Sequence, residues 1–448
     1  MFVWRTHRNP FLPSKAPLAL SALVIWMACD SSWAQLATDQ VPRERTVPSE
    51  EAVKQQIGKA RLRLGPLRIL PTVIVTNAGY DNNVYGTPET CPPITGCGQP
   101  KTSDWTATVS AGARFVAPLG SKIYVQGQAL PEYTWYRELS NRRTFGGLYR
   151  GTLLGFFNRM SFEAGGSFSK TFSFLTSETE TRIIQDAKHG SAKLELDLSR
   201  ALSFFAGAEA LRIRNKSVGD VPATPVDITG LDRDEAAARG GIRYRISPQW
   251  DVSAAVEGTR SEFVERPQEA NNQSVAYLIG IHYGRPRFFV NLSGGYRDGR
   301  PYSGSTFPEY KTGTGSYFVS YFLVRRLEVQ AFGHRGVSYG SLFPIPTYFI
   351  ETRNGGGLNL QVHPRLLLRG YGEYGTNDYP VPEVLGNVLV KRRDKASTVG
   401  GGFSALVYRK IVLTGLVNQS KYDSLFPGLT RKVVRFTTSL SFEGELAR

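Results

Sequence analysis

The chain has 448 residues, enough for two or three ordinary domains or one large one, and it carries a formal net charge of +16. An apolar share of 41% and a mean hydropathy of −0.25 exclude a protein built from membrane-spanning helices. Glycine and aromatic residues are abundant, and collagen is excluded because glycine does not recur at every third position.

The chain begins with a predicted export signal, residues 1–34. Basic residues precede an apolar stretch, residues 16–28, that is too short to span a bilayer comfortably. Small residues then occupy the −3 and −1 positions of a cleavage site, Ser32 and Ala34. An uncleaved anchor is the alternative. No later apolar run approaches 18 residues, so we expect an exported protein without a spanning helix.

Export also bears on the cysteines and on the charge. Cys91 and Cys97 remain after cleavage, and in an oxidising compartment we expect them to form a disulfide bond; metal binding is the alternative. A basic chain ordinarily suggests a nucleic-acid partner, but export and the dispersal of arginine along the whole chain argue against it. Anionic outer-leaflet lipid, an acidic polymer or small anions are the expected partners.

Residues 35–65 are polar and are predicted to form a periplasmic segment. Within it, Ser49 is followed by two glutamates and then by apolar Val53 and Ile57, which is the pattern of a capped helix. A solvated tail without regular structure is the alternative.

From residue 66 onward, apolar and polar residues alternate in the period of a β-strand. In residues 432–442, for example, Phe436 and Leu440 fall on one face and Arg435 on the other. Residues 122–137 repeat the pattern. It suits either a strand half-buried in a soluble sandwich or a strand with lipid on one side and a wet lumen on the other.

Tight turns interrupt this alternation at regular intervals of about 40 residues. Eight short turns, separated by seven longer polar connections, are centred near Gly120, Asn158, Arg200, Pro248, Arg285, Arg325, Pro364 and Arg409. With a first and a last loop, the nine long connections predict 18 strands, all antiparallel to their neighbours. A soluble propeller has a similar repeat but needs four strands in each period, and only two long ones fit here.

The fold class predicted from this pattern is all-β: a transmembrane antiparallel up-and-down barrel at residues 66–448, with short periplasmic turns and longer extracellular loops. A sheet survives in hydrocarbon only without free edges, so the last strand must pair with the first, near residues 67–80. Strands of about 15 residues exceed the 9–11 needed to cross a bilayer, so they should project beyond it.

Two segments resemble a known family. Residues 63–71, Arg-Leu-Gly-Pro-Leu-Arg-Ile-Leu-Pro, and residues 80–85, Tyr-Asp-Asn-Asn-Val-Tyr, are similar to the opening strand and first loop of a β-barrel porin family often described as outer membrane beta-barrel protein. The likeness in layout covers residues 60–448. It implies an eighteen-stranded barrel and, since several members are linked to exopolysaccharide or capsule secretion, a role beside periplasmic polysaccharide-export proteins. Outer-membrane barrels commonly end on an aromatic residue, whereas Phe442 is followed by six more residues.

Catalytic and metal-binding patterns are few. Residues 336–340 match the GxSxG pattern around Ser338, but a loop rather than a helix is expected to follow, so a hydrolase is disfavoured. The histidines lack metal-ligand spacing, and no cofactor-binding loop is found. No catalytic residue, metal or cofactor is therefore predicted, and the chain is not expected to be an enzyme.

The predicted functional surface is the lumen. The inward faces carry nine candidate pore-lining basic residues, Arg114, Lys122, Arg150, Lys193, Arg243, Arg245, Arg297, Arg369 and Arg435. Four aromatic residues are also predicted to face inward, where their rings would support a sliding sugar chain: Tyr124, Tyr136, Phe156 and Tyr371. For each of these residues the alternative role is lumen filling, with the charged ones paired to neighbouring carboxylates.

Three functions follow from this interpretation. The first is an outer-membrane conduit for an acidic exopolysaccharide or capsule, working with periplasmic export proteins. The second is a general diffusion porin that prefers anions. The third and most remote is a lipid-modifying enzyme of the outer membrane. Outer-membrane lipid, lipopolysaccharide and the barrel-assembly machinery are the other expected partners, and nucleic acid is not.

Overall fold

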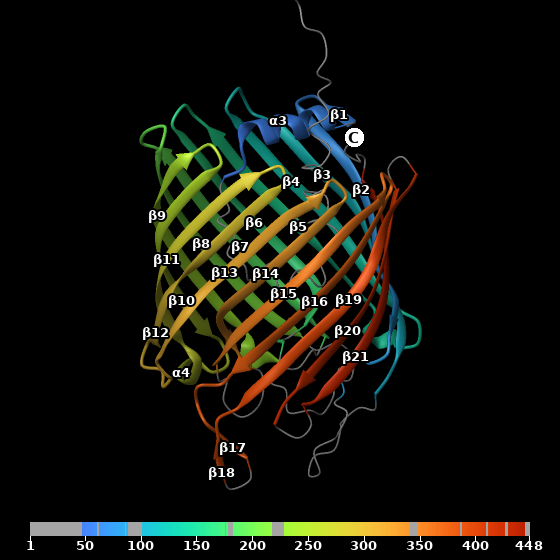
Figure 1. Ribbon diagram of the computed structural model, residues 1–448, viewed down its shortest axis with the longest axis vertical. Helices are drawn as coiled ribbons and strands as arrows, with labels where there is room; N and C mark the ends of the chain where they lie inside the picture. The colour runs from blue at the N-terminus through green and yellow to red at the C-terminus, as the bar shows by residue number, and fades with distance from the viewer. Residues whose placement is uncertain are drawn as a thin grey trace, which may run out of the picture.

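The computed structural model describes residues 47–60, 62–85, 87, 101–174, 176–177, 182–216, 228–340, 348–385, 388–408, 411–425 and 429–443. Eighteen long strands form one closed antiparallel sheet (Figure 1). They are β2 (Leu67–Asp81), β3 (Asp104–Pro118), β4 (Ile123–Tyr136), β5 (Thr144–Phe156), β6 (Met160–Phe174), β7 (Arg182–Asp197), β8 (Leu202–Lys216), β9 (Arg233–Ser247), β10 (Trp250–Phe263), β11 (Asn272–Arg285), β12 (Phe288–Pro301), β13 (Tyr310–Val324), β14 (Leu327–Tyr339), β15 (Tyr348–His363), β16 (Leu366–Asp378), β19 (Arg393–Tyr408), β20 (Ile411–Asp423) and β21 (Arg431–Glu443).

The barrel closes where the first long strand meets the last. β2 pairs with β21 in an antiparallel register that includes Val75 opposite Leu440 and Tyr80 opposite Phe436. A bulge interrupts the pairing around Asn77, whose φ of 51° is in the left-handed region. The short strand β1 (Leu62–Leu64) pairs only with the start of β2. The prediction of an 18-stranded closed barrel is confirmed.

The two rims differ as the spacing predicted. Seven of the eight predicted short turns lie within the described residues, each between the strands that the sequence indicated and at one rim together with helix α3 (Glu50–Lys59). The eighth, at Arg409, lies outside the described residues. The longer connections lie at the other rim (Figure 1). They contain η1 (Ser140–Arg142), η2 (Thr229–Leu231), α4 (Pro267–Ala270) and a small hairpin of β17 (Glu383–Leu385) and β18 (Val388–Val390).

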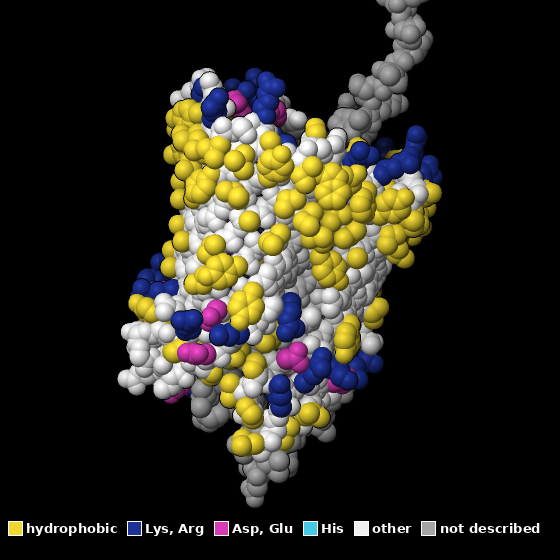
Figure 2. Space-filling view, turned by 60° about the vertical axis from the view of Figure 1, so that its left-hand side comes forward, with side chains coloured by type: hydrophobic (Ala, Val, Ile, Leu, Met, Phe, Trp, Pro, Cys, Tyr) yellow, Lys and Arg dark blue, Asp and Glu magenta, His cyan; other side chains and the backbone are white. Residues whose placement is uncertain are grey.

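Alternation gives the barrel an apolar exterior near the short-turn rim. On β9, Ile242, Tyr244 and Ile246 are more than half exposed, whereas the intervening Arg243 is buried. Figure 2 shows apolar side chains gathered in the upper part of the face it presents, with Lys, Arg, Asp and Glu below them. The outward faces therefore change from apolar to charged along the strands, and the strands extend past the apolar band.

None of the described helices is long and apolar enough to cross a membrane.

The seam, where β2 pairs with β21, leaves no space for a side chain at Gly79. A Cβ added to Gly79 would lie 1.9 Å from the backbone oxygen of Phe436 on β21, whereas Gly240 on β9 has open space around that position. We expect Gly79→Val to force the seam apart and to destabilise the barrel by on the order of 3 kcal/mol or more. Gly240→Val should leave stability nearly unchanged. Loss of the heat-modifiable gel shift of the folded barrel measures the effect, and equal stability of the two variants would contradict it.

Candidate functional site

The lumen holds a cavity of about 850 Å³. Its wall comes mainly from the inward faces of β7 to β10 and β12 to β15, so the strand alternation selects which side chains reach it. Its charged side chains are His189, Lys193, Glu195, Glu209, Arg233, Glu235, Arg239, Arg243, Glu257, Arg297, His334 and Glu351. This mixture can bind a polar solute of small-molecule size.

Two arginines of the wall are held by carboxylates on other strands. The Arg243 guanidinium donates to Glu195 at 2.5 Å and lies 3.9 Å from Asp251. The Arg297 guanidinium donates to Glu257 at 2.5 Å and to the Ser274 hydroxyl at 2.8 Å. Each arginine is thus held in one orientation by charge-assisted hydrogen bonds.

A second polar network covers the wall of β14 to β16. Arg353 forms an ion pair with Glu351 at 2.8 Å and donates to the Asn377 amide oxygen at 2.8 Å. All three side chains are nearly fully buried, which requires such pairing.

Ser338, the centre of the GxSxG pattern, belongs to this network. Its hydroxyl donates to Glu351 Oε2 at 3.2 Å, and the same oxygen lies 3.7 Å from His334 Nε2. The carboxylate therefore sits between serine and histidine, whereas an activated serine needs the histidine beside it. Ser338 also lies within strand β14, with its pairing to β15 intact, and not at a strand-to-helix turn. This geometry does not make Ser338 a nucleophile.

Ser177, one of the described residues between β6 and β7, contacts the opposite wall of the lumen near the long-loop rim. Arg431 of β21 donates to the backbone oxygen of Ser177 at 3.0 Å, and the Asn377 amide of β16 lies 3.4 Å from the Ser177 hydroxyl. β7 and β16 are nine strands apart in the barrel order, so Ser177 reaches the opposite wall. The lumen is narrowed at this level.

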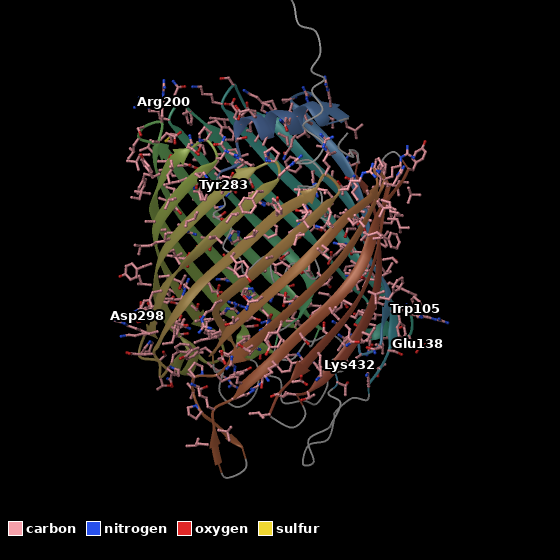
Figure 3. The ribbon with its side chains drawn as sticks, viewed as in Figure 1. Trp105, Glu138, Arg200, Tyr283, Asp298 and Lys432 are labelled. Atoms are coloured by element: carbon pink, nitrogen blue, oxygen red, sulfur yellow. The ribbon has the colours of Figure 1, made fainter. Side chains whose placement is uncertain are left out.

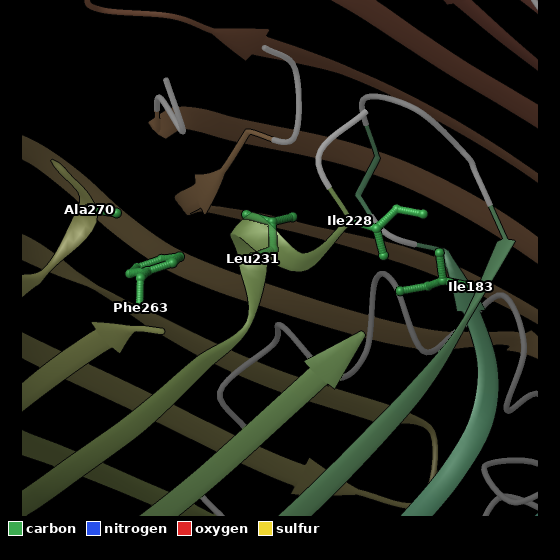
Figure 4. Packing of buried hydrophobic residues seen from close by; sticks show 5 residues of the cluster. All are labelled: Ile183, Ile228, Leu231, Phe263 and Ala270. Atoms are coloured by element: carbon green, nitrogen blue, oxygen red, sulfur yellow. The ribbon is translucent and has the colours of Figure 1, made fainter. Parts of the chain in front are cut away.

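Apolar side chains support the same constriction. Ile228 and Leu231, from the connection before β9, pack with Ile183, Phe263 and Ala270 of the neighbouring wall (Figure 4). A second cluster gathers the rings of Phe307, Tyr310, Tyr348 and Tyr339. Inward-folded loops with their own hydrophobic contacts hold a fixed shape better than solvated ones.

Helix α3 narrows the opposite end. Ser49 caps it by accepting a hydrogen bond from the Ala52 N–H at 3.3 Å, as the sequence indicated. Its apolar face, with Val47, Val53 and Ile57, packs against lumen-facing side chains of β3 to β5, which are Val116, Tyr124, Leu154 and Phe156.

Two hydrogen bonds join α3 to β4. The Tyr124 hydroxyl donates to Glu50 at 3.2 Å, and the Gln126 amide donates to Gln56 at 3.1 Å. The hydrogen bond from Lys54 holds the pKa of the Glu50 carboxyl below its ordinary value. The helix therefore lies inside the short-turn mouth and is bound to the wall by apolar and polar contacts.

The predicted basic residues occupy three kinds of place. Lys193, Arg243 and Arg297 line the cavity, and Arg114 and Arg369 lie on the inward faces of their strands. Lys122 and Arg245 lie at the short-turn rim, where Lys122 donates to Asn158 at 3.2 Å.

The remaining two predicted basic residues pair with carboxylates on adjacent strands. The Arg150–Glu163 distance is 3.2 Å and the Arg435–Asp81 distance is 3.0 Å. Arg435 is among the most deeply buried side chains described, so it joins the seam of the barrel more than it lines an open pore.

The predicted aromatic residues are mostly covered. Tyr124 and Phe156 lie beneath α3, and the Arg142 guanidinium lies 5.9 Å from the ring centre of buried Tyr136. Tyr371 packs against the backbone of Gly400, where an added Cβ would lie 2.6 Å from its ring. These four do not form one continuous aromatic path.

Several lining residues were missed by sequence analysis. Arg233 and Arg353 each alternate with a glutamate on the same strand face, a signal that could have identified them. Ser177 had no such signal, because a loop's path through the lumen depends on the far wall. Cys91 and Cys97 lie outside the described residues, and within those residues no His, Cys, Asp or Glu group could hold a metal ion.

Comparisons with known proteins agree on the fold. No protein-family model and no curated protein matches the chain. The Pseudomonas aeruginosa structure of OccK2 (OpdF) in complex with glucuronate aligns with 84% of this chain and 98% of its own, at 11% identity and a TM-score of 0.50. The outer membrane protein OpdK from the same organism aligns over 84% and 98%, at 8% identity and a TM-score of 0.49. The chain shares the barrel fold of these outer-membrane proteins.

The exterior and the fold together give the location. A closed antiparallel barrel satisfies every strand-to-strand hydrogen bond without an edge, and its apolar band matches a hydrocarbon layer. The protein is an outer-membrane β-barrel of the bacterial envelope.

The crossing of Ser177 can be tested by crosslinking. In a chain with Cys91 and Cys97 replaced by serine, we expect Ser177→Cys and Asn377→Cys to form a disulfide bond upon mild oxidation, because their side chains touch in the lumen. Mass spectrometry of the unreduced peptides measures the bond. Ser177→Cys with Ser397→Cys, which lies on the outer face, should remain unlinked; equal crosslinking of both pairs would contradict the crossing.

Proposed function

We propose that the protein is an outer-membrane diffusion channel for small organic anions. The observation that carries the proposal is the lumen cavity of about 850 Å³ with Arg243 and Arg297 fixed in its wall. A solute carboxylate fits the planar guanidinium fork of either residue. The complex of OccK2 with glucuronate, a sugar acid, supports this class of solute on a similar barrel.

A polysaccharide conduit is less well supported. A sliding polymer needs a continuous open path, whereas Ser177 and its neighbours narrow one end of the lumen and α3 narrows the other. The aromatic side chains that would line such a path are largely covered. A lumen narrowed toward both rims suits a small solute better than a polymer.

Selectivity is expected to be modest, because the charges of the lining nearly balance. Five Lys or Arg side chains and five Glu side chains point into the cavity. Basic groups raise the local concentration of anions, and the carboxylates that hold them reduce that effect. Removing one member of a pair should therefore shift selectivity in a direction set by the charge that remains.

Two double variants test this balance: one removes two negative charges from the lining and the other removes two positive charges. Glu195→Gln with Glu257→Gln should raise the anion-to-cation permeability ratio a few-fold, because Arg243 and Arg297 lose their compensating charges. Arg243→Gln with Arg297→Gln should lower it by a similar factor. The reversal potential in planar bilayers under a salt gradient measures both. A shift of the same sign in both variants, or none in either, would overturn the assignment of these pairs to the conduction path.

Helix α3 is proposed to restrict flow through the short-turn mouth. Val53 is fully buried between the helix and the wall, so Val53→Asp should displace α3 and raise single-channel conductance about two-fold or more. Gln55→Asp, on the exposed side of the same helix, is the matched control and should conduct like the parent.

A crosslink provides the reverse test. Gln56→Cys with Gln126→Cys, in the cysteine-free background, should hold α3 against β4 and keep conductance low until a reductant is added. If Val53→Asp and the oxidised crosslink conduct equally, α3 does not restrict the channel.

A further inference from the structure

The outer surface of β15, β16, β19 and β20 changes character along the strands. On β19, exposed Val399 is followed toward the long-loop rim by Ser397 and Lys395, which point the same way. On β20, exposed Val417 is followed by Gln419 and Lys421. The polar side chains therefore begin where the apolar band ends, on strands that are neighbours in the sheet.

A hollow of about 430 Å³ lies at this boundary, outside the barrel. Its outward-facing polar lining comes from four strands: Asn354 pairs with Tyr374, Tyr374 with Ser397, and Ser397 with Lys421. Gln419 completes the set. The Tyr317 hydroxyl donates to Asn354 Oδ1 at 3.1 Å, which orients that amide and directs its N–H groups elsewhere. The hollow thus combines amide, hydroxyl and ammonium donors.

Basic side chains surround the hollow. Lys432 lies opposite Lys421 in the register, and Lys395 lies two residues from Ser397 on the same face. Within the described residues neither Lys395 nor Lys432 has a hydrogen-bond or ion-pair partner, whereas Lys421 pairs with Asp423 at 2.9 Å. Figure 3 places Lys432 in the lower half of the barrel, on the long-loop side. The three lysines outnumber the one carboxylate among them, Asp423, which lies opposite Lys395 in the register, and the remaining positive charge favours a bound anion.

Basic side chains are also in excess over acidic ones on the rest of the outer surface near the long-loop rim. Basic side chains outnumber acidic ones on the outward faces near the long-loop rim: Lys170, Lys188, Arg212, Arg214, Lys216, Arg260, Arg300, Lys311, Arg335, Arg393, Lys395, Lys421 and Lys432 against Asp186, Asp234, Glu262, Asp298, Asp378 and Asp423. Most of the pairs on the β8 to β12 side are satisfied locally, as in the contact of Asp234 with Arg212 and Arg214. The hollow is where a polar cavity, lined by the paired Lys421, lies beside Lys395 and Lys432, which have no ion-pair partner among the described residues.

We propose that this hollow binds the phosphorylated sugar headgroup of an outer-leaflet glycolipid of the lipid A type. Lys395, Lys421 and Lys432 would hold the phosphate, and Asn354, Ser397 and Gln419 would hydrogen-bond the sugar hydroxyls. The acyl chains would lie along Val399, Val417 and Val434, which are exposed on the adjacent apolar surface. The glycolipid is favoured over a phospholipid because sugar hydroxyls match the amide and hydroxyl donors, and because the long-loop rim faces the outer leaflet. This site does not depend on what the channel conducts.

Binding to the purified, detergent-folded full chain tests the proposal. The probe is diphosphoryl lipid A, compared with monophosphoryl lipid A and with phosphatidylglycerol, and the readout is the bound fraction in native mass spectrometry across a lipid titration. The site variant carries Lys395→Gln, Lys421→Gln and Lys432→Gln. The control carries Arg200→Gln, Arg325→Gln and Arg326→Gln, which remove the same charge from the short-turn rim, where Figure 3 shows Arg200.

We expect diphosphoryl lipid A to bind the parent and the control alike and the site variant roughly 10- to 100-fold more weakly, since each lysine near an anionic surface contributes on the order of five-fold. Monophosphoryl lipid A should bind the parent less tightly than the diphosphoryl form. The gel shift of the folded barrel verifies that each variant is intact. Equal binding by site and control variants would overturn the location of the site, and equal binding of phosphatidylglycerol would overturn the glycolipid assignment.

Discussion

Every feature of this protein depends on the pairing of β2 with β21. In hydrocarbon an unpaired backbone N–H or C=O finds no water, so eighteen strands are stable there only if the last returns to the first. Closing eighteen strands into one sheet sets a wide circumference, and the side chains of the wall cannot fill the interior of a barrel this wide. The interior must then be occupied by water, by paired charges or by parts of the chain that fold inward. This protein uses loops, a helix and ion pairs together.

The interior charges follow from the same geometry. Neighbouring antiparallel strands place opposite residues on one face about 5 Å apart, so an inward arginine readily meets a carboxylate of the next strand. Arg150 with Glu163 and Arg435 with Asp81 are such pairs. Arg243 on β9 and Arg297 on β12 reach farther, each across one intervening strand, to Glu195 on β7 and Glu257 on β10. A formal charge of +16 therefore does not make the lumen strongly positive, because basic side chains also gather on the outside, toward both rims of the barrel.

The fold was largely accessible from the sequence, because period-two alternation and turn residues are local signals. The seven predicted turns within the described residues lie where the sequence placed them, and Ser49 caps α3, which was one of the two alternatives that the sequence left open for that segment. The face of a strand on which a side chain lies also follows from the local sequence pattern. For that reason Lys193, Arg243 and Arg297, which line the cavity, were among the residues predicted to face the lumen. The segments that cover a side chain, however, can be distant in the sequence, and local patterns do not reveal them. The burial of Tyr124 under α3 and the reach of Ser177 to Asn377 depend on segments 70 to 200 residues away.

Successive side chains of a strand point alternately to the lumen and to the lipid. The interior network and the proposed lipid site therefore depend on the same strand register. On β19, buried Asp394 faces the lumen and accepts a hydrogen bond from the Tyr422 hydroxyl at 2.6 Å. Its neighbour Lys395 faces outward beside the proposed lipid site. A slip of one residue would exchange them, placing a lysine in the interior network and a carboxylate among lysines that face lipid headgroups. Because both placements would be unfavourable, the charges on each side oppose the same slip, and the lumen and the lipid surface together fix one register.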